Sequence, residues 1–195
     1  ENKWNSFTIS QLTKLDEIPN KSFVITFDDG FEDNYLNAFP ILKKYGIKAT
    51  IYLVPNQKTN HWEEKNTSVL SNLLDEKQIL EMQNSGLIEF GSHTMSHVNL
   101  SKIDDKELLI ELVKSKIEVE NITQKECEAF AYPYGKFDDN ILNSVKRVGY
   151  KNATVVKRGL FKKDDDVFTI KRVGILGTES FFDFLLKISR VRNKL

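Results

Sequence analysis

Short apolar runs typical of β-strands alternate with amphipathic runs typical of helices along this 195-residue chain. The clearest strand is residues 23–27, in the segment SFVITFDDG, where β-branched and aromatic residues stop at two carboxylates and a turn glycine. Further strands are predicted at residues 47–54, 87–91, 128–132, 150–156 and 167–173, and helices at 10–15, 31–45, 75–85, 101–121, 138–148 and 179–191. The alternation, without repeats or linkers, predicts one α/β domain over residues 1–195 with a parallel sheet, either barrel-like or open.

Composition excludes several classes of partner. Twenty-eight basic residues balance twenty-eight acidic ones, so no net field attracts nucleic acid or an anionic membrane. No apolar run is long enough to span a membrane, and the beginning ENKWNSFTIS lacks the pattern of a signal peptide. We therefore expect a soluble chain, cytoplasmic as given, or periplasmic or in the cell envelope if an N-terminal segment was removed. The single cysteine, Cys127, is predicted to be structural.

Asp28 and Asp29 stand at the carboxyl end of the first predicted strand. Active sites of α/β folds lie beyond this end of the strands. Adjacent carboxylates repel each other, so a cation or several hydrogen bonds must compensate them there. The alternative is that they cap the next helix, because Asp is a common N-cap and turn residue.

His93 and His97, in SHTMSH, follow the third long strand in the same way that the two aspartates follow the first. On a helical turn, residues four apart share one face, a spacing suited to a common metal ion. The alternative is a pair of exposed polar residues in a loop. Two imidazoles and one carboxylate form a facial triad suited to zinc or another divalent ion, and the second aspartate stays free to act as a base.

With TFDDG, HTMSH and a strand that ends in AYPYG, the chain resembles the polysaccharide deacetylase family, also called the NodB-homology domain or carbohydrate esterase family 4. The resemblance extends from about Phe23 to Phe184, and is greatest to the branch that acts on bacterial lipopolysaccharide or exopolysaccharide. It implies a distorted, incomplete (β/α) barrel of about seven parallel strands, and a zinc-dependent deacetylase of polysaccharides or their precursors.

The resemblance also implies residue roles. Asp28 would be the general base, while Asp29, His93 and His97 would bind the metal, and Pro133 and Tyr134 would line the groove, with the Tyr134 N–H helping to hold an oxyanion. The metal would polarise an acetamide and lower the pKa of water, and Asp28 would take the proton during attack.

The chain departs from the family pattern at two places. Ala131 stands where many members have an arginine that steadies the base, and Arg172 is the candidate to supply that charge. No histidine follows His97, although the family draws its general acid from a later motif. The acid is then either His61, in the polar loop next to Trp62, or a histidine that precedes residue 1. Trp62 is a candidate for stacking on a sugar ring.

These observations predict a metal-dependent hydrolase that removes N-acetyl groups from an amino sugar of a bacterial surface glycan. Three alternatives stay open: an O-deacetylase, an amidase acting on a compound that is not a sugar, and a glycan-binding pseudoenzyme that lacks its acid.

Overall fold

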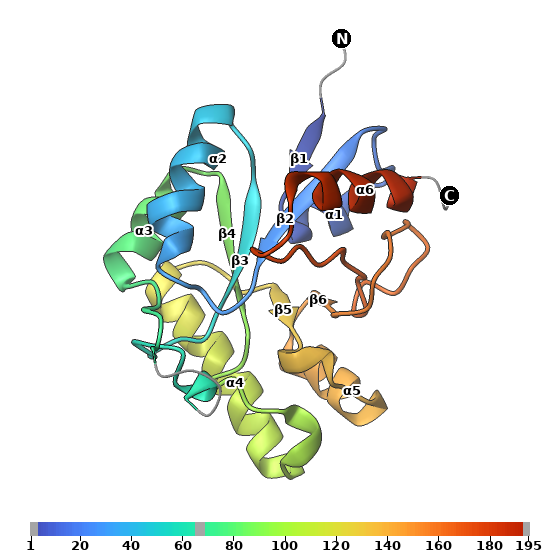
Figure 1. Cartoon of the computed structure of the whole chain (residues 1–195). Helices are drawn as coiled ribbons and strands as arrows, with labels where there is room; N and C mark the ends of the chain where they lie inside the picture. Colours follow the sequence, from blue (N-terminus) through green and yellow to red (C-terminus); the bar gives the residue numbers. More distant parts are fainter. Residues whose placement is uncertain (1–3, 65–68, 193–195) are drawn as a thin grey trace.

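The computed structural model describes residues 4–64 and 69–192, and these residues form one curved, six-stranded sheet (Figure 1). The strands neighbour one another in chain order and every pair is parallel. Their bounds are β1 Asn5–Phe7, β2 Ser22–Phe27, β3 Ala49–Leu53, β4 Ile88–Ser92, β5 Ala129–Ala131 and β6 Asn152–Thr154. Within the described residues β1 and β6 do not pair, so the sheet is a half-barrel that stays open, as predicted for an incomplete (β/α) barrel.

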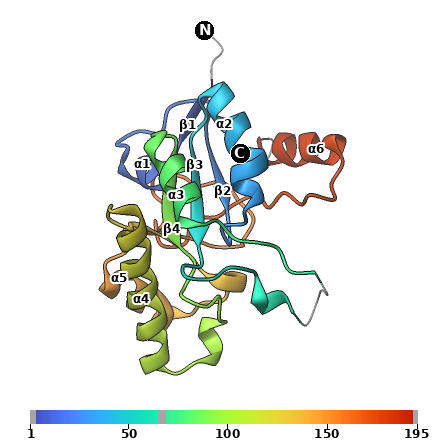
Figure 2. The ribbon, with the colours of Figure 1, turned by 90° about the vertical axis from the view of Figure 1, so that its left-hand side faces the viewer.

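Four helices cover the outer face of the sheet (Figures 1 and 2). They are α2 Phe39–Tyr45, α3 Glu76–Asn84, α4 Asp105–Thr123 and α5 Asp139–Val148. Their apolar faces and the outward side chains of β3, β4 and β5 form the main core, which includes Leu42, Ile51, Leu112, Phe130 and Val145. Burial of these side chains holds the helices against the strands.

A short helix, α1 Ile9–Lys14, packs on the inner face, close to the predicted range 10–15. Its Ile9 joins Tyr52, Ala129, Ala131 and Ile170 in a second, smaller core. The Ile9 amide donates a hydrogen bond of 2.9 Å to Thr50 Oγ1, which ties the helix to β3. The inner face therefore has a small packed core of its own.

Two strand predictions differ from the structure. In place of the strand predicted over residues 167–173 there is a turn followed by a single parallel bridge between Thr154 and Ile170, because the Phe168 and Thr169 amides donate to Asp166 rather than to a neighbouring strand. The edge strand β1 was not predicted, since its residues are mostly polar. As the next strand from this edge, β2 is half-buried along its length rather than fully buried.

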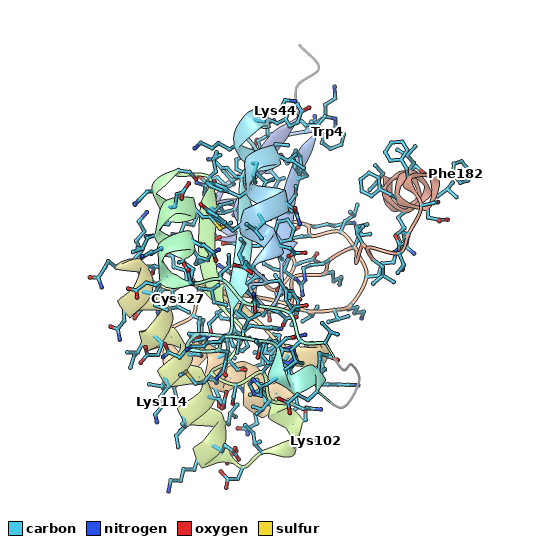
Figure 3. The ribbon with its side chains drawn as sticks, turned by 60° about the vertical axis from the view of Figure 1, so that its left-hand side comes forward. Trp4, Lys44, Lys102, Lys114, Cys127 and Phe182 are labelled. Atoms are coloured by element: carbon cyan, nitrogen blue, oxygen red, sulfur yellow. The ribbon has the colours of Figure 1, made fainter. Side chains whose placement is uncertain are left out.

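The last helix, α6 Phe181–Arg192, stands apart from the body of the molecule (Figures 2 and 3). Phe182, labelled in Figure 3, is 67% exposed, and Phe181 is 74% exposed. Among the described residues, no helix combines the length and the apolar character that a membrane crossing needs.

The strand register brings the two polar segments to one edge of the sheet. Phe27 pairs with Ile51, which pairs with Phe90, so Asp28 and Ser92 leave the sheet at nearly the same level. The aspartates after β2 and the histidines after β4 are thus neighbours, although β3 separates their strands.

Candidate metal centre

The turn after β2 separates the two aspartates. Asp29 and Gly30 both have left-handed backbones, with φ of 71° and 72°. A side chain at Gly30 would be strained at that φ, and its Cβ would lie 2.8 Å from Leu53 Cδ2. The capping alternative is wrong, because the next helical segment, η1 Asn34–Ala38, has Asp33 at its N-cap. Both aspartates are instead directed into the site.

The two histidines come together, but not on a helical turn. Residues 93–99 form an irregular loop, with left-handed backbones at Thr94 (φ 68°) and His97 (φ 54°). The helical-turn argument for the spacing was therefore wrong, and chain reversals within the loop produce the proximity. The ring centroids of His93 and His97 lie 4.8 Å apart, and both residues are buried. The alternative of two exposed loop residues is also wrong.

Asp29, His93 and His97 form the one cluster in the described ranges, 4–64 and 69–192, that could hold a metal ion. Asp29 Oδ1 lies 3.2 Å from His97 Nε2 and 3.6 Å from His93 Nε2. This oxygen is buried, and no hydrogen-bond donor among the described residues satisfies it. An orphaned buried acceptor that faces two imidazole nitrogens fits a divalent cation.

Contacts on the far side of each ring fix which nitrogen faces the cluster. His93 Nδ1 lies 2.7 Å from the Ala131 carbonyl oxygen, so it donates its proton there and leaves the Nε2 lone pair free. His97 Nδ1 lies 3.2 Å from the Tyr134 hydroxyl and can do the same. Such outer hydrogen bonds orient metal-binding imidazoles and set their tautomer.

The charge states also suit a cation. Burial raises the pKa of Asp29 to about 6. The nearby Asp28 and Glu63 carboxylates also raise this pKa, whereas His93 lowers it. Burial, with His93 close by, lowers the pKa of His97 to about 3. The Asp29–His97 contact is therefore not an ion pair at neutral pH. A neutral imidazole and an ionised carboxylate are the forms that bind metal.

Asp28 faces Arg172, which comes from the segment after the single β-bridge. Arg172 Nη1 and Nη2 donate to the two Asp28 carboxylate oxygens at 2.7 and 2.8 Å. Arg172 also donates to Thr26 Oγ1 at 3.0 Å, which fixes the guanidinium against β2. Burial alone would raise the pKa of Asp28, but the Arg172 hydrogen bonds and nearby positive charge keep it below its ordinary value. The structure thus brings together Asp28 and the arginine predicted to replace the one missing at position 131.

A short 3-10 helix, η2 His61–Glu63, lies over the cluster. The Trp62 ring stacks on the His97 ring at 4.6 Å between centroids, with 26° between the planes. His61 meets the Trp62 ring edge-on at 5.3 Å. His61 and Trp62, the loop residues singled out from the sequence, therefore lie next to the candidate metal ligand His97. The remainder of the loop at 65–68 is outside the described residues.

The third motif forms another wall of the site. Pro133 and Tyr134 lie in the 3-10 turn η4 Pro133–Gly135, where Tyr134 has φ 58° and packs edge-on against His97 at 4.7 Å. Tyr132 is buried and stacks on Phe137, as expected of a core residue. Cys127 is buried, and burial raises the pKa of its thiol well above the ordinary value, in agreement with a structural role.

Sequence reasoning missed three groups around the cluster. They are the Ala131 carbonyl that holds His93, the Glu63 carboxylate that acts on Asp29, and Glu111 of α4, which binds the histidine loop. Only Glu111 gave a sequence signal, because an acidic residue interrupts the apolar face formed by Leu108 and Leu112.

Comparisons with known proteins agree with this geometry. The family profile described as polysaccharide deacetylase matches residues 16–153. A poly-beta-1,6-N-acetyl-D-glucosamine N-deacetylase of Staphylococcus epidermidis is 34% identical in an alignment of length 191 that covers 92% of this chain and 64% of that protein.

Solved structures of deacetylases superpose on this fold. A polysaccharide deacetylase from Bacillus cereus superposes with a TM-score of 0.77 at 32% identity, covering 95% of this chain and 56% of that one. The Streptococcus pyogenes deacetylase PplD, solved with acetate, superposes with a TM-score of 0.76 at 28% identity, covering 92% and 75%. The chain spans 55–64% of the length of the curated relatives to which it is similar.

Proposed function

The chain belongs to the polysaccharide deacetylase family, and from this premise we propose that it is a metal-dependent hydrolase of acetylated amino sugars. The substrate is an N-acetylated bacterial surface polysaccharide or its precursor. One observation carries the proposal: an Asp–His–His cluster with two buried histidines lies beside a second aspartate that an arginine holds in its ionised form. The proposed metal ligands and the proposed base, Asp28, are therefore different residues at the same edge of the sheet.

Asp29, His93 and His97 would hold the cation through one carboxylate oxygen and two Nε2 atoms. A divalent ion, zinc being the first to test, supplies a Lewis acid that polarises an amide carbonyl and lowers the pKa of water. The donor set of two imidazoles and one carboxylate leaves positions open for water and substrate.

Asp28 is the proposed general base. It takes a proton from the attacking water, and Arg172 keeps the carboxylate ionised and in a fixed orientation through two parallel hydrogen bonds. Negative charge that develops on the carbonyl oxygen is met in part by the Tyr134 N–H. The products are acetate and a free amine.

His61 is the proposed general acid, which gives a proton to the leaving nitrogen. Its position next to Trp62, which itself stacks on the ligand His97, supports this role. Trp62 and Pro133 are the proposed sugar contacts. A histidine from a segment before residue 1 is the competing source of the proton.

The substrate proposal rests on the relatives. The Staphylococcus epidermidis protein is named for deacetylation of poly-beta-1,6-N-acetyl-D-glucosamine, so an N-acetylglucosamine oligomer is the first substrate to test. Lipopolysaccharide precursors, O-acetylated sugars and small amides complete the panel, because the same residues could hydrolyse each of them. Residues 1–195 are proposed to act as one domain.

The test is acetate release from that panel by zinc-loaded protein, measured for the wild type, Asp28→Asn and the exposed control Asp16→Asn. We expect release by the wild type and the control, and a rate at least about 100-fold lower for Asp28→Asn, since a general base contributes 10²–10⁴-fold. Zinc content is measured on each sample.

The outcomes separate the alternatives. Release from esters or small amides alone would replace the proposed substrate. Sugar binding and zinc binding without turnover would identify a pseudoenzyme. Turnover by Asp28→Asn at the wild-type rate would contradict the assignment of the base.

A further inference from the structure

We propose that Glu111, on helix α4, is a positioning residue that sets the shape of the loop carrying the two metal-binding histidines. The loop is residues 93–97, which we call the ligand loop. Glu111 lies outside the cluster and contacts neither histidine directly in any of its hydrogen bonds. It acts through the backbone between them.

The Glu111 carboxylate accepts three hydrogen bonds from the ligand loop. Its Oε2 accepts from the Met95 amide at 2.9 Å and from the Ser96 amide at 3.1 Å. Its Oε1 accepts from the Ser96 hydroxyl at 2.5 Å. Hydrogen bonds to a charged acceptor contribute more than neutral ones, and three of them join Met95 and Ser96, which lie between the two histidines, to Glu111.

The conformation of the ligand loop needs such an anchor. Thr94 and His97 both have left-handed backbones, which are unfavourable for residues other than glycine. Successive N–H groups turned toward one side form a concave anion site, and in this loop the Glu111 carboxylate is the anion. On either side of the two residues that Glu111 binds, His93 and His97 place their Nε2 atoms 3.6 and 3.2 Å from Asp29 Oδ1.

Glu111 is itself only 7% exposed, and the partners found for its oxygens are all in the ligand loop. A buried carboxylate is costly unless hydrogen bonds satisfy it. An apolar side chain at position 111 would avoid the cost of burying a charge, because it would extend the apolar face that Leu108 and Leu112 form on α4. The acidic residue is thus explained by the loop that it binds.

Helix α4 holds the segment at a second point. One turn after Glu111, Ser115 Oγ accepts a hydrogen bond of 2.8 Å from Ser92 Oγ, the residue before His93. The two contacts lie on the same face of the helix, four residues apart. The end of β4 and the ligand loop are therefore held against one rigid element, with Glu111 supplying the contact nearest to the centre of the loop.

This inference rests on the metal site of the proposed function, but not on the reaction or its substrate. Its measurement is accordingly metal binding. Zinc affinity is determined by competition with a chromophoric chelator for the wild type, Glu111→Ala and Glu111→Gln. The visible spectrum of the cobalt-loaded protein reports ligand geometry, and thermal melting of the metal-free protein reports folding. Glu107→Ala, an exposed change one turn earlier on α4, is the control.

We expect Glu111→Ala to weaken zinc affinity by about 10–100-fold, the range for a lost outer partner, and to alter the cobalt spectrum. Glu111→Gln should restore part of the affinity, because its side-chain oxygen can still accept from the loop amides. Glu107→Ala should bind zinc as the wild type does. A purely structural Glu111 would lower the melting temperature and leave affinity and spectrum unchanged in the folded protein.

A folded Glu111→Ala with wild-type affinity and spectrum would overturn the inference. If that variant does not fold, the zinc affinity and cobalt spectrum of Glu111→Gln provide the test, and wild-type values for both would overturn the inference. A wild type that binds no metal would overturn both this inference and the proposed site. A wild type that binds zinc but releases no acetate would overturn the proposed reaction alone.

Discussion

Residues 5–154 and residues 155–192 contribute to the same site in different ways. The first region is regular, with six strands and helices α1 to α5, and it supplies Asp28 and the three candidate ligands. The second region has, among its described residues, one β-bridge and the exposed helix α6, yet it supplies Arg172. A packed core therefore positions the candidate ligands, whereas a single long-range ion pair from an irregular segment holds the proposed base, Asp28.

The comparison shows that different kinds of interaction stabilise the two halves of the site. Burial in the core keeps the ligand-bearing strand ends in place. The Asp28–Arg172 pair instead depends on two charged hydrogen bonds and on the Thr26 hydroxyl that orients the guanidinium. Substitutions in the two regions should thus have separable effects on stability, metal affinity and pH dependence.

The largest expected effect is on stability, from the core of the first region. Phe130, on β5, is fully buried and packs against Tyr132 and Tyr150 with ring centroids 5.3 and 5.0 Å apart. We expect Phe130→Ala to lower the free energy of unfolding by about 3–5 kcal/mol, because it removes a buried ring and leaves a cavity. Urea denaturation measures this loss. A loss below about 1 kcal/mol would show that the core does not carry the ligand-bearing strands.

The next effect is on metal affinity. Asp29→Asn removes the ionised oxygen that faces His93 and His97. We expect zinc affinity to fall by more than about 100-fold, beyond what the loss of an outer partner costs. Isothermal titration measures it, with Asp33→Asn in the same turn region as a matched, exposed control. Unchanged affinity would mean that the cluster is not the metal site.

Arg172→Met should affect the base and spare the metal. Arg172 holds the pKa of Asp28 below its ordinary value, so its loss raises that pKa. The base works in its ionised form, and the acidic limb of kcat/KM against pH should therefore move to higher pH. We expect about 10–100-fold lower activity below neutral pH, from the loss of charged hydrogen bonds of about 1.5–3 kcal/mol.

Two controls sharpen this prediction. Zinc affinity of Arg172→Met should equal that of the wild type, since Arg172 contacts no candidate ligand through its hydrogen bonds. Arg172→Lys should restore the position of the limb in part, because it keeps the charge but not the paired geometry. An acidic limb that stays in place in both variants would show that Arg172 does not set the state of the base.

The smallest effect is expected on α6. Phe182 is 67% exposed, and its helix stands apart from the body (Figure 3). We expect Phe182→Ser to change the free energy of unfolding by less than about 0.5 kcal/mol, because surface substitutions without buried partners have little effect. The urea measurement used for Phe130→Ala provides the contrast. A loss of 2 kcal/mol or more would show that α6 packs against the core in solution.

Local sequence patterns predicted the elements of the first region well. The strand over residues 23–27 and the helix capped by Asp75 have their predicted places, the latter with a capping box between Asp75 and Gln78. These features depend on neighbours in the chain, on side-chain periodicity and on caps. The strand expected at 167–173 is absent because Asp166 accepts hydrogen bonds from the Phe168 and Thr169 amides, which form a turn where a strand ladder would begin.

What the sequence by itself determined is the parallel α/β architecture and the set of ligand types at two strand ends, because strand order and apolar periodicity are local properties. Only the tertiary structure decided how the candidate ligands meet and how Asp28, the proposed base, is held. The ligand loop folds around Glu111 through backbone angles that Thr94 and His97 do not signal. Arg172 was a candidate only through the resemblance to the family, since it lies 144 positions from Asp28 and no local pattern encodes the contact between them.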